Sequence, residues 1–215
     1  MNQITRLTGG VGDGPRERIV DSLVRQGFAI EPDYLSPSLI KALRREIRRR
    51  DARNEFTPAA VGRQDSLHHN ALIRRDRTHW LDGSTLAQMR VFAELELLRT
   101  DINQALFLGL FDLEAHFALY PTGGFYRRHL DAFRGDNPRV VSVVIYLNSR
   151  WRPVHGGCLR IWPQRDAVTP LMDVAPRAGT LVCFLSELIP HEVLPSHAER
   201  LSIAGWFRRN EGPPL

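Results

Sequence analysis

Lysine is nearly absent from this 215-residue sequence, and cysteine is scarce. Lys41 is the only lysine, so arginine supplies almost all of the positive charge. The two cysteines, Cys158 and Cys183, fall in strand-like stretches of a chain without an export signal. This setting favours reduced, structural thiols, and a disulfide between them is the less favoured alternative.

Long hydrophobic runs are also missing. No stretch of about 18 apolar residues occurs, and the first ten residues are polar and contain glycine, unlike a signal peptide. We therefore expect a cytoplasmic protein without a membrane partner.

The charge balance is basic, with a formal net charge of +5 and a sequence pI of about 9.8. Such a balance raises the possibility of nucleic-acid binding. The arginines are nevertheless scattered, apart from a cluster within residues 44–50. That cluster is more typical of a solvated helix face, although it can also steer an acidic partner.

The apolar and charged fractions, 43% and 25%, are those of an ordinary globular protein. Residues 1–14 contain glycines and no periodicity, which predicts a flexible tail. Residues 15–215 are predicted to form one domain. Within it, residues 15–112 would provide helical support and a mobile substrate loop, and residues 113–215 would form the core.

Four helical segments are expected from apolar periodicity and capping residues. The first runs from Pro15 to a stop at Gly27, and the second begins at Ser36-Pro37. Ser84 is predicted to cap a long helix, and Asp101 to restart a further helical piece through residue 110. The stripe expected to be buried on the long helix is Leu86, Met89, Phe92, Leu95 and Leu98.

The second half of the chain contains many short strand patterns separated by proline and glycine. This pattern predicts an antiparallel sandwich or jelly roll with the helices packed on one sheet, a mainly β fold with supporting helices (α+β). Of the two, the resemblance described below implies the jelly roll (a double-stranded β-helix). Residues 52–70 are expected to form a polar loop. The expected strands are 28–30, 73–83, 113–120, 125–131, 139–147, 158–162, 171–174, 179–185, 190–194 and 201–208.

His129 and Asp131 lie two residues apart, a spacing that places both side chains on one face of a strand. With His191 they would complete the 2-His-1-carboxylate triad that holds iron(II) in non-haem oxygenases. We therefore predict that these three residues are the metal ligands and the catalytic centre. Ligand type alone leaves manganese and zinc as alternatives.

Arg200 is predicted to open the last strand, sharing a face with Ser202, Ala204 and Trp206. If that face points into the barrel, an arginine at its rim stands beside two small side chains. A guanidinium there suits bidentate capture of a carboxylate, and the hydroxyl of Tyr146 can add a hydrogen bond to the same carboxylate.

Several other side chains have competing interpretations. His116 shares a predicted face with Tyr120, and a packing or supporting role is favoured over a role in the pocket. Arg74 and Asp76 can pair or be solvated. The tryptophans at 80, 151 and 162 are interpreted as core or edge packing, and the histidines at 68, 69, 79, 155 and 197 as surface or turn residues.

From about residue 73 onward the chain resembles the iron(II)- and 2-oxoglutarate-dependent prolyl 4-hydroxylases, in the branch of the animal oxygen-sensing hydroxylases and their bacterial relatives. The resemblance is carried by the H-x-D motif and by the arginine six residues before a tryptophan. Further segments that carry it are Ile73–Gly83, Tyr120-Pro121, Ile145–Asn148, Gly156–Pro163 and Pro190–Val193.

The resemblance implies the same three metal ligands. It also implies that Arg200 and Tyr146 bind the distal carboxylate of 2-oxoglutarate, with Tyr120 close to this cosubstrate. The remaining positions that it assigns, as contacts to the substrate proline region, are Tyr126, Arg139 and Trp206. Residues 53–77 would correspond to the family's mobile substrate loop.

The resemblance further implies hydroxylation of a prolyl residue at C4, using Fe(2+), 2-oxoglutarate and O2, with ascorbate as a reductant. Among bacterial relatives it suggests an exposed proline of elongation factor Tu as the protein substrate. Two alternatives stay open: a nucleic-acid demethylase of the same fold, and a metal-binding sensor that does not turn over. The demethylases resemble one another in having a second arginine six residues after the cosubstrate arginine. This chain has Trp206 at that position, so nucleic acid is disfavoured as a partner.

Overall fold

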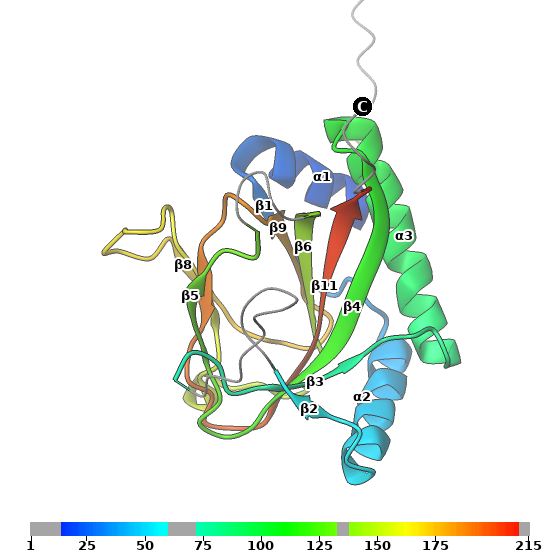
Figure 1. The fold of residues 1–215 in the computed structure, drawn as a ribbon, viewed down its shortest axis with the longest axis vertical. Helices are drawn as coiled ribbons and strands as arrows, with labels where there is room; N and C mark the ends of the chain where they lie inside the picture. The colour runs from blue at the N-terminus through cyan, green and yellow to red at the C-terminus, as the bar shows by residue number, and fades with distance from the viewer. Residues whose placement is uncertain (1–13, 60–71, 133–137, 211–215) are drawn as a thin grey trace, which may run out of the picture.

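The computed structural model describes residues 14–59, 72–132 and 138–210. The expected flexible tail, residues 1–14, lies outside these ranges except for Gly14, and residues 60–71 of the expected substrate loop lie outside them too. Two antiparallel sheets face one another, with the helices on the outer side of the larger sheet (Figure 1). This arrangement confirms the predicted jelly-roll fold.

The two sheets have seven and four strands among the described residues. The larger has the order β1-β9-β6-β11-β4-β3-β2, and the smaller has the order β5-β10-β7-β8. The bounds in the larger sheet are β1 (Phe28–Glu31), β2 (Thr57–Pro58), β3 (Arg77–Trp80), β4 (Leu110–Tyr120), β6 (Arg139–Tyr146), β9 (Leu181–Leu185) and β11 (Arg200–Arg209). Those in the smaller sheet are β5 (Tyr126–His129), β7 (Leu159–Ile161), β8 (Met172–Val174) and β10 (His191–Val193).

The helices are α1 (Pro15–Gln26), α2 (Pro37–Ala52) and α3 (Leu86–Leu106), with a short 3-10 turn at Pro153–His155. Gly27 ends α1 in the left-handed region, at a φ of 77°, and the Ser36 hydroxyl accepts the Leu39 N–H at the start of α2, as predicted. Their buried faces join the outer side of the larger sheet in one hydrophobic cluster. None of the described helices combines the length and apolar character that a membrane span requires.

The prediction for α3 was wrong in three respects. Thr85 rather than Ser84 caps it, and the helix continues through Asp101 without a restart until Phe107 adopts a left-handed conformation. The predicted stripe was correct for Leu95 and Leu98, which are buried, but wrong for Leu86 and Met89, which are exposed. Strict three-residue spacing drifts around a helix of 3.6 residues per turn. The buried positions are Gln88, Val91, Leu95, Leu98 and Ile102.

Three strand boundaries also differ from the predictions. The polar stretch expected to be a loop contains β2, which pairs with β3. The strand expected over residues 73–83 is confined to Arg77–Trp80, and β4 begins at Leu110, where a helical piece was expected. Both cysteines are free, as predicted.

A second hydrophobic cluster fills the space between the two sheets and supports the pocket. Asn148, just after β6, ties this region to the start of β11. Its side chain donates to the carbonyls of Pro176 (2.8 Å) and Leu201 (3.1 Å) and accepts the Leu201 N–H (2.7 Å). It thereby satisfies three backbone groups and fixes the residue that follows Arg200.

We expect Asn148→Ala to lower the free energy of unfolding by about 2–4 kcal/mol, because it removes the partner of the Leu201 N–H and of the Pro176 carbonyl, whereas the Leu201 carbonyl keeps the Leu147 N–H. Urea denaturation followed by circular dichroism measures the change. Asn210→Ala, at an exposed position, is the matched control and should stay within about 0.5 kcal/mol of the parent. An equally small effect at Asn148 would contradict this account of how β11 is anchored.

Candidate metal centre and anion pocket

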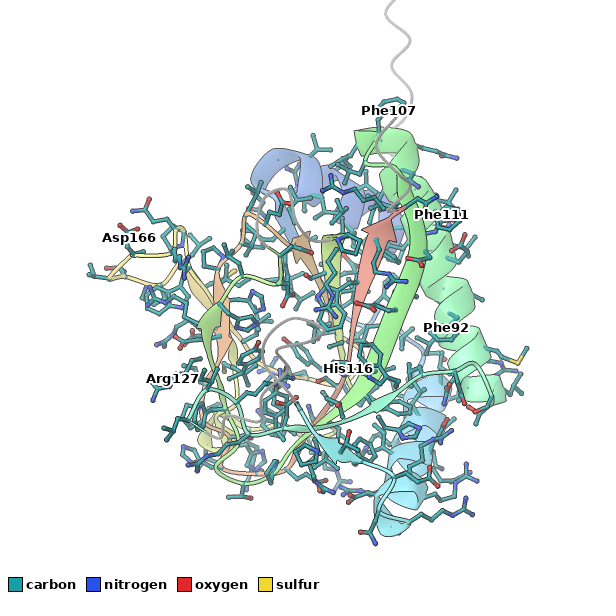
Figure 2. The ribbon with its side chains drawn as sticks, in the orientation of Figure 1. Phe92, Phe107, Phe111, His116, Arg127 and Asp166 are labelled. Atoms are coloured by element: carbon teal, nitrogen blue, oxygen red, sulfur yellow. The ribbon has the colours of Figure 1, made fainter. Side chains whose placement is uncertain are left out.

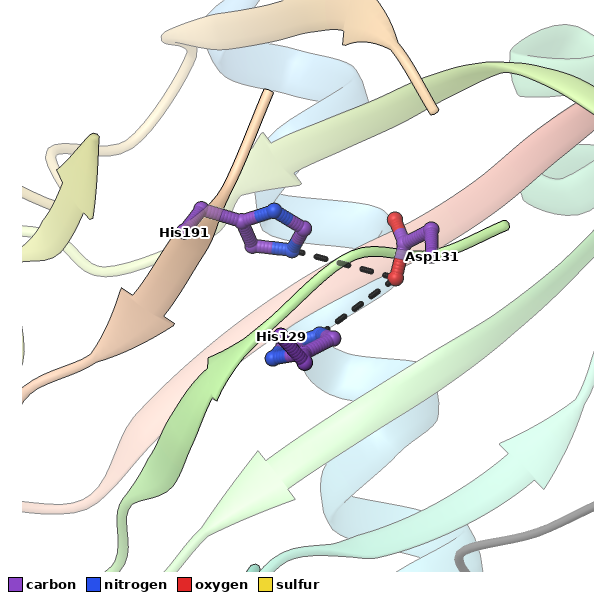
Figure 3. Close-up of side chains that lie close together, drawn as sticks. All are labelled: His129, Asp131 and His191. Carbon is purple, nitrogen blue, oxygen red and sulfur yellow. Dashed lines mark ion pairs between the residues drawn. The ribbon is translucent and has the colours of Figure 1, made fainter. Parts of the chain in front are cut away.

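Antiparallel pairing in the smaller sheet brings two distant histidines together. His191 on β10 is registered directly opposite His129 on β5, and their ring centroids are 4.3 Å apart. The Asp131 carboxylate approaches both rings, with Oδ1 3.4 Å from Nε2 of His129 and 3.8 Å from Nε2 of His191 (Figure 3). One ligand atom from each residue therefore lies within 4.8 Å of the others.

Asp131 does not lie on a strand, although the prediction placed it there. β5 ends at His129, so strand alternation is not what aligns the two side chains. Hydrogen bonding holds the carboxylate instead: the Ser142 hydroxyl on β6 donates to Asp131 Oδ2 at 2.6 Å and contacts the Ser186 hydroxyl at 2.8 Å. One carboxylate oxygen is thus occupied while the other faces the imidazoles.

Backbone carbonyls define the form of both imidazoles. Nδ1 of His129 lies 2.7 Å from the Arg127 carbonyl, and Nδ1 of His191 lies 3.0 Å from the Ile189 carbonyl. A carbonyl can only accept, so each Nδ1 carries the proton and each Nε2 presents a lone pair. This is the orientation that a metal-binding imidazole requires.

The electrostatics support a neutral His191 and an ionised Asp131. Burial, and then the neighbouring His129, lower the pKa of His191 to about 4, so this imidazole is neutral near pH 7. Burial alone would raise the pKa of Asp131. His191, His129 and the Ser142 hydroxyl outweigh it and hold that pKa well below its usual range. Two neutral imidazoles and one carboxylate suit a borderline divalent cation such as iron(II).

A pocket of about 640 Å³ extends from the triad into the space between the sheets. It includes Arg200, which was expected at the rim but is buried, with 1% of its surface exposed. Gly157, at a φ of 64°, packs closely against this region: a Cβ there would lie 2.9 Å from Ser196 Oγ and 3.2 Å from Arg200 Cδ.

The Arg200 guanidinium has only neutral partners among the described residues. Nε donates to the Gly157 carbonyl at 3.0 Å, and Nη1 to the Ser202 hydroxyl at 3.3 Å. The rings of Tyr120 and Tyr146 flank it at 4.8 and 5.1 Å. A buried cation without an anion is costly, so this arrangement is built for an anionic ligand.

Tyr146 adds a second group that needs a partner. Its hydroxyl is buried without a hydrogen bond in the described part of the chain. Burial raises the pKa of Tyr146 to about 12, against the opposing effect of Arg200, so the phenol stays protonated and can donate. The residues beside Arg200 therefore fit a bound carboxylate.

The other residues singled out by the resemblance line the same pocket. Tyr126 stacks on His129, with centroids 3.7 Å apart. Arg139 lies 3.6 Å from the Trp206 ring centroid and pairs with Glu114 at 2.6 Å. The Trp206 indole N–H is buried without a partner among the described residues, which leaves a donor for a ligand in the pocket.

Some residues interpreted as packing also reach the pocket. His116 is buried between Trp80 (5.1 Å) and Trp206 (5.5 Å) and lines the cavity, in the middle of the fold (Figure 2). Trp80 is half-exposed and lines it too.

Arg74 and Asp76 do pair, through two hydrogen bonds of 2.7 and 2.6 Å, and the Arg74 guanidinium lies 4.4 Å from the Tyr126 ring centroid. Trp162 is buried and Trp151 half-buried. Of the histidines interpreted as surface residues, 68 and 69 lie outside the described residues. His79 is half-buried, with Nδ1 2.8 Å from the Glu55 carbonyl.

We expect one divalent ion to bind per chain, measured by the visible absorption of cobalt(II) in a titration of the full-length protein. His129→Ala removes a ligand and should abolish saturable binding. Ser142→Ala frees Asp131 Oδ2 and should weaken binding by roughly tenfold or more. His197→Ala, at an exposed position, should bind like the parent, and retention of the site in His129→Ala would refute the proposed ligand set.

We expect the stability of the fold to decrease as the pH falls from about 6.5 to 4, partly because of His116. Burial and the nearby Arg74 lower the pKa of this group from 6.5 to about 4, so in that window the unfolded chain takes up a proton that the folded chain does not. His116→Met should remove roughly 2–3 kcal/mol of this loss by pH 4, measured by urea denaturation at several pH values. Parallel pH curves for the parent and the variant would contradict the assignment, and His197→Met is the control.

Comparisons with known proteins give a consistent result. The model of the 2OG-Fe(II) oxygenase superfamily matches residues 115–208. A crystal structure of a Pseudomonas putida prolyl-4-hydroxylase is 47% identical, with a TM-score of 0.81, over 91% of this chain and 99% of that one. A Trichoplax adhaerens prolyl hydroxylase, in complex with a hypoxia inducible factor peptide fragment, is 25% identical, with a TM-score of 0.78, over 90% of this chain and 88% of that one.

The hypoxia-inducible factor prolyl hydroxylase of Caenorhabditis elegans is 31% identical over 204 residues, or 89% of this chain. The chain spans only 28% of the length of that curated relative. The match to the bacterial enzyme, in contrast, covers nearly the whole of both chains. The chain therefore belongs to the prolyl 4-hydroxylase family, within the 2OG-Fe(II) oxygenase superfamily.

Proposed function

We propose that the protein is an iron(II)- and 2-oxoglutarate-dependent dioxygenase that hydroxylates a prolyl residue of a protein substrate at C4. The observation that carries the proposal is the buried Arg200 guanidinium, which has no carboxylate partner among the described residues and shares one pocket with the triad. A dicarboxylate cosubstrate has a group for each end of that pocket: its 2-oxo acid group can coordinate the metal, and its distal carboxylate can pair with Arg200.

Iron held by these residues would supply, with 2-oxoglutarate and dioxygen, the oxidation of a substrate C–H bond: one atom of dioxygen would enter the substrate and the other would enter succinate, with loss of carbon dioxide. The residues of the chain position the reactants. His129, Asp131 and His191 would hold the metal on one side and leave the pocket side open. Tyr146 would donate to the carboxylate at Arg200, and Tyr120 would close that end against water.

Tyr126, Arg139 and Trp206 would contact the segment that carries the proline. Tyr126 is stacked on a proposed metal ligand, and the Trp206 N–H, which has no partner among the described residues, offers a hydrogen bond to a backbone carbonyl. A relative of the same fold has been solved with a peptide fragment bound, which supports a peptide rather than a small molecule as the ligand of this region.

Elongation factor Tu is the specific substrate that we propose, on the resemblance to bacterial relatives, and it would place the reaction in the cytoplasm. An exposed loop prolyl suits a pocket that opens to the surface. Ascorbate would serve as the reductant that restores oxidised iron. A gain of 16 Da on a proline of elongation factor Tu, in host cells with the protein but not in cells without it, tests this assignment.

We expect Arg200→Ala to lower kcat/KM for 2-oxoglutarate by at least about 100-fold, because it removes the charged partner of a desolvated carboxylate. Tyr146→Phe, which removes one hydrogen bond to that charge, should cost about 10-fold. Succinate formation with a proline peptide measures both effects, and Arg90→Ala, at an exposed position on α3, is the control.

Cobalt(II) binding without 2-oxoglutarate should be unchanged in both variants, which separates cosubstrate capture from damage to the metal centre. Normal KM values for 2-oxoglutarate in Arg200→Ala would overturn the proposal. Turnover stimulated by methylated DNA instead of a proline peptide would support the demethylase alternative, and metal binding without any turnover would support the sensor.

A further inference from the structure

The pocket has an unbalanced charge. Among its described lining residues, five are arginines and one, Asp131, carries a carboxylate, which faces the two histidines. Three of the arginines already have a role in the structure: Arg200 is buried beside the cosubstrate region, Arg74 pairs with Asp76 and Arg139 pairs with Glu114. Two arginines of β5 remain, Arg127 and Arg128.

These two arginines have no carboxylate partner in the part of the chain that the structure describes. Arg127 is exposed, and its Nε donates to the Leu72 carbonyl at 2.5 Å. Arg128 donates from Nη1 to the carbonyls of Ala167 (2.8 Å) and Arg165 (3.0 Å), and its guanidinium carbon lies 3.2 Å from the Trp162 ring centroid. Neutral contacts thus hold both guanidinium groups in place while their charges stay uncompensated.

Their location links them to the substrate. Both lie immediately before His129 on β5 and line the pocket, and Arg127 points outward from the smaller sheet (Figure 2). A protein segment whose proline reaches the triad must pass over this strand. We name these two side chains the β5 arginine pair.

We propose that the β5 arginine pair selects a protein segment with aspartate or glutamate within a few residues of the target proline. This inference rests on the proposed prolyl hydroxylation and specifies its substrate class. A guanidinium held by stacking and carbonyl contacts is pre-organised for a carboxylate. Uncompensated positive charge at the mouth also steers an acidic segment toward the pocket.

The distribution of charge favours an acidic peptide over a nucleic acid. Tight binding to a phosphate backbone uses a track of roughly 6–10 cationic contacts. Apart from the enclosed Arg200, only two arginines without a carboxylate partner line the pocket among the described residues. The arginines of α2 do not extend this track. Arg48 pairs with Glu199 and Arg50 with Glu46 and Glu55, and the helix lies on the outer side of the larger sheet (Figure 1).

The test compares two fluorescein-labelled 19-residue peptides with one central proline. The first has aspartate or glutamate at four flanking positions, and the second has asparagine or glutamine there. Fluorescence anisotropy with the manganese(II)- and 2-oxoglutarate-loaded full-length protein measures binding without turnover. A labelled 20-nucleotide single-stranded DNA is the third probe.

The acidic peptide should bind at least about fivefold more tightly than the neutral one at low salt, because each exposed ion pair contributes about two- to fivefold. Arg127→Gln combined with Arg128→Gln should reduce this preference below twofold. The double lysine variant keeps the charges and should retain most of it. Arg90→Gln removes an exposed positive charge from α3 and should leave the preference intact.

Equal binding of the two peptides, a preference that survives the double glutamine substitution, or tighter binding of the DNA would each overturn the inference. Mass spectrometry of the same peptides after aerobic reaction with iron(II) separates this failure from that of the proposed function. Hydroxylation of both peptides with equal affinity counts against the β5 arginine pair alone. If neither peptide gains 16 Da, the result counts against prolyl hydroxylation.

Discussion

The direct pairing of His191 with His129 across β10 and β5 is the constraint on which the site depends. The two residues are 62 positions apart, and only the antiparallel register of the smaller sheet makes their rings neighbours. A slip of one residue would point one imidazole to the opposite face. The strands of this sheet are three or four residues long, so its register depends on packing against the larger sheet through the cluster between them.

The larger sheet supplies the rigidity and the carboxylate-binding end. β11 pairs along its length with β4 and β6, and Arg200, at its start, is registered opposite Tyr120. Asn148 secures the next residue through three hydrogen bonds. A buried guanidinium without an anion makes the fold less stable than an apolar side chain would. This loss of stability is consistent with a site that is completed when an anionic ligand binds to Arg200. A ligand that must reach both Arg200 and the triad also requires the two to be held at a fixed separation, which a rigid sheet provides.

Much of this organisation could be predicted from the sequence, and the rest shows which information a sequence does not carry. Alternation and the positions of glycine and proline were sufficient for the jelly roll, and the H-x-D motif with a later histidine pointed to the cluster. The position of Asp131 beyond the end of β5 could not be foreseen, because the Ser142 hydroxyl that holds it belongs to another strand. The carbonyls that orient the two imidazoles were also missed, because residue spacing does not state where a backbone oxygen points. The burial of Arg200 could not be predicted because it involves the close approach of Gly157, a residue 43 positions earlier. The buried face of α3 was assigned incorrectly because residues were counted every three positions, whereas an α-helix has 3.6 residues per turn.

The basic composition illustrates how structure changes the meaning of a sequence property. A net charge of +5 is compatible with nucleic-acid binding when the arginines are considered as a sum. In the fold, the arginines differ by their surroundings: on α2 Arg48 and Arg50 pair with carboxylates, in the pocket Arg74 and Arg139 are neutralised, and Arg200 is enclosed. What remains beside the triad is a small positive region on one short strand. Two positive charges are too few to follow a nucleic-acid backbone, but they match one or two acidic side chains. The arginine content of this chain is therefore better interpreted as a preference for acidic residues beside the target proline than as a sign of nucleic-acid binding.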